Sequence, residues 1–447
     1  MTVVVVGGGI AGILSALLLS RNGESVCLVE REQRLGGLYR SFTNESGQAF
    51  DCGTHFLRQT GIGPLDELLF GDVTGSGWRV FDTLHAGGYY GGVLNAGSPF
   101  VDATMLPTRT YQQGMVELLE RVEELDNPDT VEDQLHQIYG TTLTKNLFEP
   151  ILRKYYGCSL DRLVPDAHHV MGLSRILGFT PSASREIKKS RVYDGKIGFH
   201  SFREGAGGLK NFYPVTGGVE SWIELLRSQM DRSGRVVIRT GASVQCVESD
   251  QGIVNGVLLD NGETVPCSQL VWSVPAALLL KACGVEIPGR PPLERLTTHL
   301  LHFAFDRPFL TDAHYVHCHE PTMSPFRITL YPNMQGDPTG RHLTVEVLTT
   351  SDETGADLTP KVQSELRQMG IVPAEAVCEF SQVDTLPGGF PLPTPELSEA
   401  IEMHAETAGR LLENVTLLGR ARGKNFLTSQ VLTDVFESIS ELSRREG

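Results

Sequence analysis

The first forty residues constrain the fold of this 447-residue chain more than any other segment. A run of β-branched residues, Val3 to Val6, meets glycines at 7–9 and then an apolar pattern with helical spacing from Ile10 to Ser20. After a break at 21–23, a second β-rich run, Ser25 to Val29, ends at Glu30. Two such runs flanking a helical pattern predict a strand, a helix and a parallel strand. The sequence therefore predicts a βαβ unit here.

The turn between the first strand and the helix has the pattern Gly-x-Gly-x-x-Gly, formed by Gly7, Gly9 and Gly12. In such a turn the first glycine permits a tight bend, the second lets a diphosphate approach the backbone, and the third lets helix and strand pack closely. The diphosphate would bind the free N–H groups at the start of the helix, where Ile10 and Ala11 lie. We therefore expect these five residues to contact a dinucleotide.

An acidic residue supports the same interpretation. Glu30 closes the second strand 18 residues after Gly12, where its carboxylate can accept hydrogen bonds from both hydroxyls of an adenosine ribose. A carboxylate at this position disfavours a 2′-phosphate, so NADP is not expected. Glycines alone would also fit an ordinary glycine-rich turn in a parallel sheet. The acid at this distance favours an adenine dinucleotide.

The string Leu35-Gly36-Gly37-Leu38-Tyr39-Arg40-Ser41 follows the acid closely. Together with the N-terminal motif it resembles the extended signature of glutathione-reductase-type FAD proteins of the amine oxidase branch. The resemblance implies FAD as the cofactor, with the Gly36–Gly37 backbone close to its diphosphate. It also adds Arg31 and Leu38 to the predicted cofactor-binding residues.

Parallel sheets of this type are assembled from separated segments, and later parts of the chain supply matching pieces. The predicted fold is α/β: a glutathione-reductase-type Rossmann FAD-binding domain with an α+β substrate domain. The first comprises residues 1–100, 213–298 and 405–447, and the second comprises residues 101–212 and 299–404. In the second, helical patterns cover Tyr111 to Leu125, Val131 to Tyr139 and Leu143 to Tyr155. The segments 299–305, 315–319, 327–331 and 342–348 resemble antiparallel strands.

Two later segments are expected at the cofactor by the same resemblance. The backbone of Val244 would contact the adenine. An apolar strand at 414–418 runs into Gly419 and Arg420, which would lie beside the ribityl chain, and a helix from Gln430 to Ser443, capped at 428–429, would direct its N–H groups toward the flavin. The alternative is an edge strand and a surface helix without a ligand.

A basic window lies between residues 150 and 214, with eleven Lys or Arg and five acids, a net charge of +6 within a chain of net charge −16. Guanidinium groups bind diphosphates in two-point fashion. We therefore expect an anionic substrate, with Arg153, Arg175, Arg185 and Arg191 as candidate ligands. A solvated basic face that balances acids elsewhere is the alternative.

Several strings outside the cofactor motif sharpen the resemblance, among them 146–157, 212–218, 325–331 and Phe50-Asp51-Cys52-Gly53-Thr54-His55-Phe56. They resemble protoporphyrinogen-oxidase-like proteins and UDP-galactopyranose mutase. The resemblance implies that His55 lies next to the flavin and that Arg327 and Tyr331 lie in the substrate pocket, as the candidate catalytic residues. A core histidine and strand residues with a buried ring are the alternatives. The mutases carry an aromatic–Asn–Asp string where this chain reads Gly423-Lys424-Asn425-Phe426, a departure from their pattern.

Three functions follow from these patterns. The first is an FAD-dependent oxidoreductase that passes a hydride from a small, anionic substrate to flavin N5. The second is a flavin-dependent, non-redox mutase of a nucleotide sugar, and the third is an FAD-bound scaffold without turnover.

Composition excludes other classes. The charge of −16 argues against non-specific nucleic-acid binding. Apolar runs are too short to span a bilayer and no secretory leader is recognisable, so a cytoplasmic protein is expected. The eight cysteines form no Cys-x-x-Cys pair, and a metal site is not expected, even at His314, His317, Cys318 and His319. The oligomeric state is not predicted.

Overall fold

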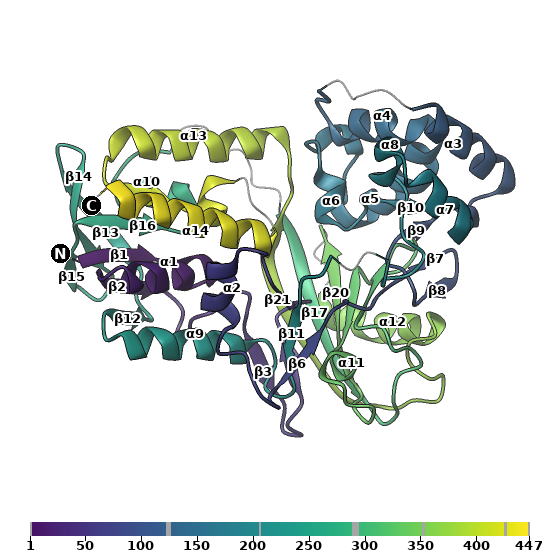
Figure 1. Cartoon of the computed structure of the whole chain (residues 1–447), viewed down its shortest axis with the longest axis horizontal. Helices are drawn as coiled ribbons and strands as arrows, with labels where there is room; N and C mark the ends of the chain where they lie inside the picture. The colour runs from purple at the N-terminus through teal and green to yellow at the C-terminus, as the bar shows by residue number, and fades with distance from the viewer. Residues whose placement is uncertain are drawn as a thin grey trace.

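The structure, a computed structural model, describes residues 2–121, 127–204, 207–287, 295–350, 354–423 and 427–445. Two sheets form its framework, and most of the short helices between 131 and 194 gather at one end of the molecule (Figure 1). Both chain ends lie at the opposite end, beside β1.

The first sheet is parallel and has the strand order β12-β2-β1-β16-β22. Its strands are β12 (Val236–Thr240), β2 (Ser25–Glu30), β1 (Thr2–Val6), β16 (Gln269–Trp272) and β22 (Val415–Leu417). Segments separated by almost the whole chain therefore pair as neighbours. This arrangement confirms the predicted Rossmann-like α/β fold class.

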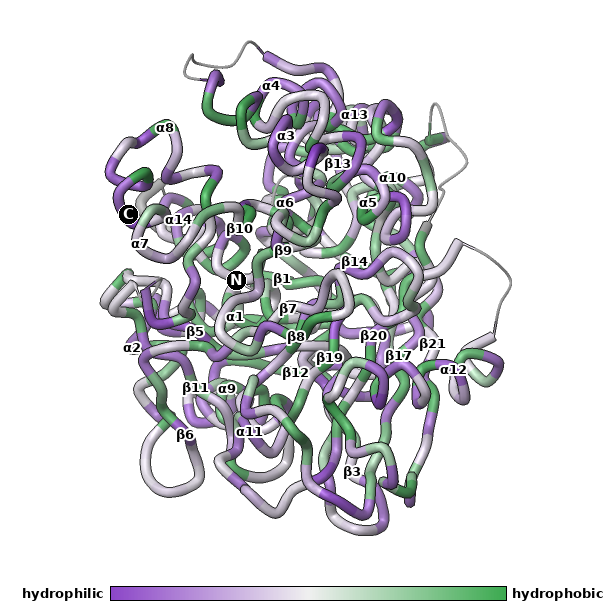
Figure 2. Tube along the Cα trace, turned by 90° about the vertical axis from the view of Figure 1, so that its right-hand side faces the viewer, coloured by the Kyte–Doolittle hydropathy of each residue, from purple (hydrophilic) through white to green (hydrophobic). Residues whose placement is uncertain are grey.

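Alternation along β1 explains how helices cover both faces of this sheet, because successive side chains point to opposite faces. Val3 and Val5 pack with α1 (Ile10–Arg21), α9 (Glu220–Ser233) and α14 (Thr428–Arg445). The opposite face, with Val4 and Val6, packs on other elements. These are α10 (Ala276–Ala282), α13 (Pro395–Leu411) and the sheet of β13 (Val244–Asp250), β14 (Ile253–Leu259) and β15 (Thr264–Pro266). Figure 2 shows β1 passing through the interior with hydrophobic residues.

The second sheet has seven strands in the order β21-β17-β20-β19-β18-β7-β8 and is antiparallel except for the pair β18–β7. The strands are β21 (Cys378–Pro391), β17 (Arg295–Phe305), β20 (His342–Thr349), β19 (Arg327–Leu330), β18 (Tyr315–Cys318), β7 (Ala86–Tyr90) and β8 (Val93–Asn95). The four antiparallel strands predicted between 299 and 348 all occur. One unpredicted feature is that β7 and β8, placed in the first predicted domain, pair with this sheet.

The two faces of the second sheet differ in character. Val345 and Ile328 lie on an apolar face that packs against α12 (Gly355–Gln368). On the other face, the register places His317, Arg327 and Glu346 side by side across β18, β19 and β20. A polar yet buried sheet face is unusual, and it borders the loop that follows β4.

The helical part comprises α3 (Thr108–Glu120), α4 (Val131–Leu143), η2 (Thr144–Phe148), α5 (Glu149–Tyr156), η3 (Leu160–Arg162), α6 (Ala167–Val170), α7 (Pro181–Ile187) and α8 (Arg191–Asp194). The predicted helix from Leu143 to Tyr155 differs in detail: a π-helical turn precedes α5, and Gly140 at φ +83° kinks α4. The predicted end of α3, Leu125, lies outside the described residues.

Short elements connect these parts. They are β3 (Ser41–Thr43), β4 (Ala49–Asp51), β5 (Leu57–Arg58), α2 (Gly63–Phe70), β6 (Trp78–Phe81), β9 (Val101–Asp102), η1 (Ala103–Met105), β10 (Ile176–Leu177), β11 (Asn211–Pro214), α11 (Tyr331–Gln335) and η4 (Gly419–Arg422). The last, η4, leads from β22 toward α14.

Candidate functional site

The N-terminal turn is built so that two of its glycines cannot be replaced. Gly7 has φ +101°, and a Cβ there would lie 2.5 Å from Ser273 Oγ. A Cβ on Gly12 would lie 1.8 Å from the carbonyl oxygen of Gly7. These contacts show the tight bend and the close helix–strand packing that the glycine pattern predicts.

Gly9 differs from these two glycines, because a Cβ on it would meet no atom within 4 Å. It is the residue before α1, with φ −75°, and its Cα faces open space beside the start of that helix. The Gly36–Gly37 turn closes around it: Gly36 donates its N–H to Gly8 O at 2.8 Å, and Gly37 approaches the Gly9 Cα. Two glycine motifs thus form one shallow backbone cradle, with Leu38 half-buried beside it.

Glu30 lies at the edge of this cradle. Its carboxylate accepts hydrogen bonds from the N–H groups of Gly8 (2.6 Å) and Glu32 (2.8 Å). The Ala242 N–H binds Glu30 O at 3.1 Å, which brings the half-buried Val244 into the same neighbourhood. Arg31 extends into solvent and pairs with Glu32 at 3.3 Å.

The C-terminal motif reaches the same cradle. At Gly419, which has φ +56°, a Cβ would lie 3.3 Å from the Ala11 Cβ in the first turn of α1. Asp434 on α14 accepts a hydrogen bond from the Gly419 N–H at 3.3 Å and pairs with Arg422 at 3.0 Å. The side chain of Arg420 lies outside the described part of the structure. The strand end at 419 and the helix α1 therefore meet, and the place of Gly419 and Arg420 beside a ribityl chain stays a prediction.

His55, Tyr39 and the first turn of α14 lie together. The Tyr39 ring is 4.8 Å from the His55 ring, and the Tyr39 hydroxyl is 2.6 Å from Thr428 Oγ1. His55 is half-buried, with Nε2 2.9 Å from the carbonyl oxygen of Cys52. The candidate flavin neighbour and the helix end predicted to face the flavin thus share one neighbourhood.

The loop that carries His55 begins at Asp51, a fully buried carboxylate. Asp51 accepts hydrogen bonds from the hydroxyls of Tyr213 (2.6 Å) and Ser41 (2.7 Å) and from the N–H of Val219 (2.9 Å). Burial raises its pKa to about 6, although these hydrogen bonds act in the opposite direction. The start of the loop is therefore fixed by contacts to distant segments.

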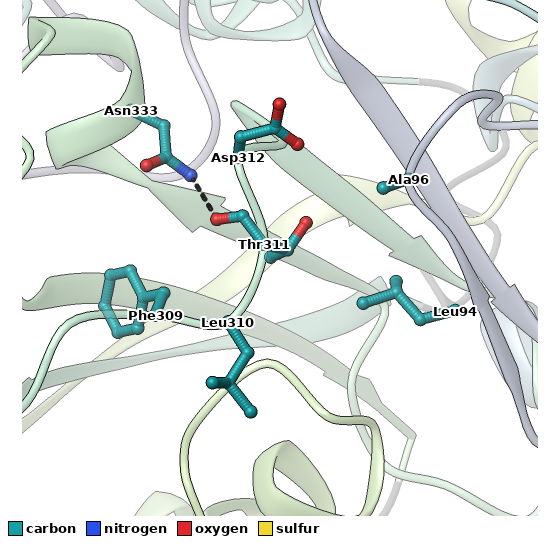
Figure 3. A pocket seen from close by; sticks show the side chains of 7 residues that line it. All are labelled: Leu94, Ala96, Phe309, Leu310, Thr311, Asp312 and Asn333. Carbon is teal, nitrogen blue, oxygen red and sulfur yellow. Dashed lines mark hydrogen bonds between the residues drawn. The ribbon is translucent and has the colours of Figure 1, made fainter.

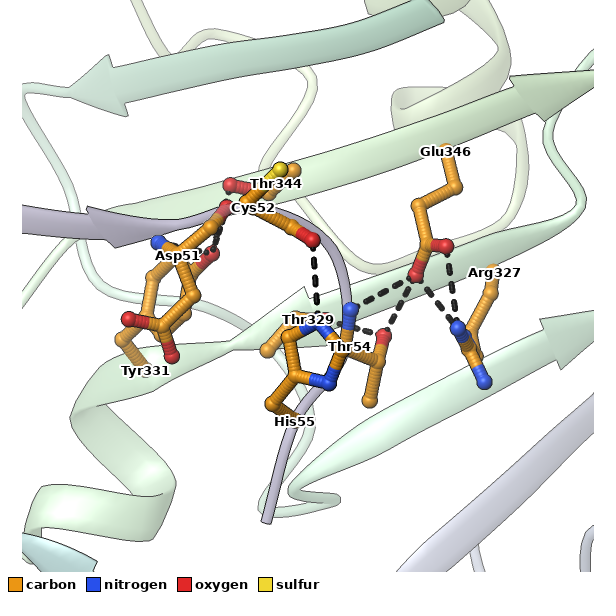
Figure 4. Close-up of polar contacts among 9 residues, drawn as sticks. All are labelled: Asp51, Cys52, Thr54, His55, Arg327, Thr329, Tyr331, Thr344 and Glu346. Carbon is orange, nitrogen blue, oxygen red and sulfur yellow. Dashed lines mark hydrogen bonds and ion pairs between the residues drawn. The ribbon is translucent and has the colours of Figure 1, made fainter. Parts of the chain in front are cut away.

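The other end of the loop is held by Glu346 on β20 (Figure 4). Its Oε1 accepts hydrogen bonds from the Thr54 N–H (2.8 Å) and hydroxyl (2.7 Å). The same carboxylate forms a two-point ion pair with Arg327, Nε–Oε1 2.8 Å and Nη2–Oε2 2.9 Å. Burial opposes ionisation of Glu346, but Arg327 and Thr54 outweigh it, so the pKa of Glu346 lies below its ordinary value.

Tyr331 is placed differently from a substrate-facing residue. Its ring is fully buried, and its hydroxyl accepts the Asp51 N–H (2.9 Å) and donates to Thr344 Oγ1 (2.7 Å). It lies at the start of α11 and not within a strand. A catalytic role for Tyr331 stays a prediction that no contact supports, whereas its structural role at the Asp51 loop is clear.

The four candidate substrate arginines do not converge through any contact among the described residues. Arg153 pairs with Glu149 one turn away on α5 at 2.8 Å, and Arg185 pairs with Glu204 at 3.2 Å. Arg175 binds Asp194 O at 2.9 Å, and Arg191 is exposed at the start of α8. These contacts suit a solvated basic face, and substrate binding by these residues stays a prediction.

Sequence reasoning missed two residues that organise the site, Glu346 and Tyr39. Glu346 lies in a strand pattern whose alternation of polar and apolar residues gives no sign of a partner. Only its position opposite Arg327 in the register reveals the pair. Tyr39 was within the quoted string, and its aromatic ring beside two glycines was the available signal.

One surface hollow of about 570 Å³ lies elsewhere, lined by Leu94, Ala96, Phe309, Leu310, Thr311, Asp312 and Asn333 (Figure 3). None of these residues belongs to the glycine cradle or to the loop 51–55. Asn333 uses its amide to bind the carbonyl oxygens of Thr311 (3.0 Å) and Ala313 (2.6 Å). The hollow is thus a feature of the second sheet's edge and not part of the candidate site.

Comparison with known proteins agrees with this geometry. Residues 5–69 match the family described as NAD(P)-binding Rossmann-like domain. An uncharacterised protein of Methanothermococcus thermolithotrophicus is 45% identical over 69 residues, which cover 15% of this chain and 66% of that protein. A 4,4'-diapolycopen-4-al dehydrogenase of Metabacillus indicus is 34% identical over 104 residues, which cover 19% of this chain and 21% of that protein. A protoporphyrinogen oxidase of Homo sapiens is 44% identical over 75 residues, which cover 16% of each chain. Each match covers less than two thirds of the relative's length.

Solved structures match over nearly the whole chain. A reduced UDP-galactopyranose mutase superposes with a TM-score of 0.76 at 18% identity, covering 99% of this chain and 95% of that one. A protoporphyrinogen oxidase-like protein of Exiguobacterium sp. 255-15 gives a TM-score of 0.71 at 18% identity, with 99% of both chains covered. At this identity the likeness establishes the fold.

The fold and these likenesses fit the amine oxidase-like flavoprotein superfamily, which confirms the resemblance predicted from the sequence. Of the three relatives described above, the dehydrogenase and the oxidase are oxidoreductases. Among the described residues, no helix has the length and apolar character needed to cross a bilayer.

Proposed function

We propose that the chain is an FAD-dependent oxidoreductase that acts on a small, anionic substrate. The observation that carries the proposal is the cradle at Gly9, where open space lies at the start of α1 beside Glu30, Gly37 and Gly419. A residue without a Cβ is required there only if something else approaches the backbone. Residues 1–100, 213–298 and 405–447 would form the FAD-binding part, apart from 86–95 and 295–298, which belong to the second sheet.

Within this proposal the N–H groups of Ile10, Ala11 and Gly12 hold the diphosphate, and the Glu30 carboxylate holds the ribose hydroxyls. The Val244 backbone lies toward the adenine, and the segment 419–420 lies toward the ribityl chain. Bound FAD supplies an acceptor for a hydride from the substrate. His55, whose ring contacts that of Tyr39, would border the flavin ring. Arg327 would bind the substrate's anionic group through the part of its guanidinium that Glu346 does not occupy.

The test is direct. The purified protein, incubated with FAD and desalted, should be yellow and should lose its visible absorbance when dithionite is added. Substitution by Ala of Arg21, which is exposed at the last turn of α1, serves as a control that leaves the cradle intact. A protein that remains colourless after incubation with FAD would contradict the proposed function.

A nucleotide-sugar mutase remains the second function predicted from the sequence, but no specific contact favours it. The likeness to the mutase shows the fold, and residues 424–426, where the sequence departs from the mutase string, lie outside the described residues. Anaerobic incubation of the reduced protein with UDP-sugars separates the two functions: isomerised product without net flavin oxidation identifies a mutase.

A further inference from the structure

A single buried carboxylate connects the second sheet to the loop that carries His55. Glu346 Oε1 accepts three hydrogen bonds, two from Thr54 and one from Arg327, and Oε2 accepts a fourth from Arg327. The Glu346 side chain is 3% exposed, so solvent and ligands do not reach it. Its charge is balanced by Arg327 alone among these partners.

Arg327 is more accessible than its partner, with 21% of its side chain exposed. Its Nε and Nη2 are used by Glu346, whereas Nη1 has no hydrogen bond among the described residues. An anionic group can therefore reach Arg327 and compete with Glu346 for its positive charge.

The loop fits closely against Glu346. Gly53 has φ +98°, and a Cβ there would lie 3.3 Å from Glu346 Oε2. The hydroxyls of Thr54 and Thr329 also contact each other. The backbone of Glu346 is fixed as well, because its carbonyl oxygen accepts the Phe326 N–H at 2.7 Å. If the interaction of Glu346 with Arg327 changes, the hydrogen bonds that Glu346 accepts from Thr54, next to His55, therefore change first.

We propose that Glu346 is a positioning residue that couples anion binding at Arg327 to the loop 53–55. The proposal rests on the proposed function only in taking an anionic group as the ligand of Arg327. When an anion binds the guanidinium of Arg327, it shares the positive charge that neutralises the Glu346 carboxylate. The carboxylate then becomes a stronger hydrogen-bond acceptor for Thr54. The loop 53–55 is then held more firmly while the anion is bound.

Hydrogen–deuterium exchange of peptides covering 51–58, with and without inorganic pyrophosphate, tests the proposal on the purified protein. Pyrophosphate should slow exchange at Thr54 by about threefold or more, because opening of the loop becomes less favourable. In Glu346→Gln this protection should disappear. Yet pyrophosphate, followed by calorimetry, should bind about threefold more tightly, since Arg327 loses its competing anion. A merely structural role for Glu346 predicts weaker or unchanged binding.

Two further variants separate the steps. Thr54→Val keeps the ion pair and the backbone N–H bond but loses the hydroxyl bond to Glu346, so pyrophosphate should protect the loop less than in the wild type. Because the coupling is reciprocal, pyrophosphate should also bind somewhat more weakly, by at most about threefold. This variant also decides the question if Glu346→Gln does not fold. Glu365→Gln is the matched control, because Glu365 is a buried glutamate that accepts the Ser324 N–H at 3.1 Å on the other face of the sheet. It should leave binding and protection unchanged.

Three results would overturn the coupling: no binding of pyrophosphate to the wild type, binding without protection of the loop, or undiminished protection in Thr54→Val. None of these measurements needs flavin. A protein that fails to bind FAD would therefore contradict the proposed function without deciding the coupling, and a failed coupling would leave the flavin proposal standing.

Discussion

The buried carboxylate of Asp51 gives the folded state an unusual response to pH. Its pKa is raised from 3.8 to about 6 by burial, so the folded protein binds this proton more tightly than the unfolded chain does. The stability that Asp51 contributes is complete below its unfolded pKa and is lost as the pH rises through about 6. The difference corresponds to at most about 3 kcal/mol.

Asp51→Asn, neutral at every pH, should therefore lose less thermal stability between pH 5 and pH 7 than the wild type does. Melting temperatures at pH 5, 6 and 7 measure this, with the exposed Asp82→Asn as the control. Parallel curves for Asp51→Asn and the wild type would show that Asp51 is not the responsible group.

Two glycines of the same turn should respond oppositely to an added methyl group. In Gly12→Ala the Cβ meets the Gly7 carbonyl at 1.8 Å, so the folded state should lose about 1–3 kcal/mol or more. In Gly9→Ala the Cβ enters open space, so the melting temperature should stay the same while FAD affinity falls about tenfold or more. Thermal unfolding and titration with FAD distinguish the two, and a Gly9→Ala protein that binds FAD normally would contradict the cradle.

Among the elements, α14 connects the candidate cofactor site to the core. Leu432 is 2% exposed and packs in the core cluster shared with α1 and β1. Leu432→Ala should cost about 2–5 kcal/mol and should also weaken FAD binding, because the start of α14 shifts with it. Chemical unfolding and FAD titration measure both effects, and the exposed Glu437→Ala on the same helix should change neither. An unchanged FAD affinity in a destabilised Leu432→Ala would remove α14 from the site.

Helices and strands could be predicted from the sequence where the hydrophobic periodicity of neighbouring residues determines them. The β1–α1–β2 unit and the four central strands of the second sheet follow from periodicity, and the predicted helix 430–443 differs from α14 by two residues at each end. The kink at Gly140 was not predictable, because it depends on how α4 packs. In the candidate site, the glycine motif could be predicted from the sequence because its residues are close together along the chain. The Thr54–Glu346 contact spans 292 residues and arises only when the loop after β4 packs against the second sheet.

For the molecule as a whole, binding of FAD should raise the stability of the entire fold against unfolding. The cradle joins β1, α1, β22 and α14, so unfolding any of them destroys it. FAD should therefore raise the melting temperature with its concentration, by about 2.7 kcal/mol of added stability at a hundred times its Kd. A wild-type melting temperature independent of FAD, alongside spectroscopic evidence of binding, would show that the site melts separately.

The pairing of β22 with β16 has a consequence for biosynthesis. Translation must pass residue 417 before the edge of the parallel sheet is covered, although β1 leaves the ribosome first. Until then the backbone N–H and C=O groups on that side of β16 have no strand to pair with, and other chains can pair with them. Chaperone dependence during synthesis, and cofactor uptake only after the final helix has emerged, are the expected result.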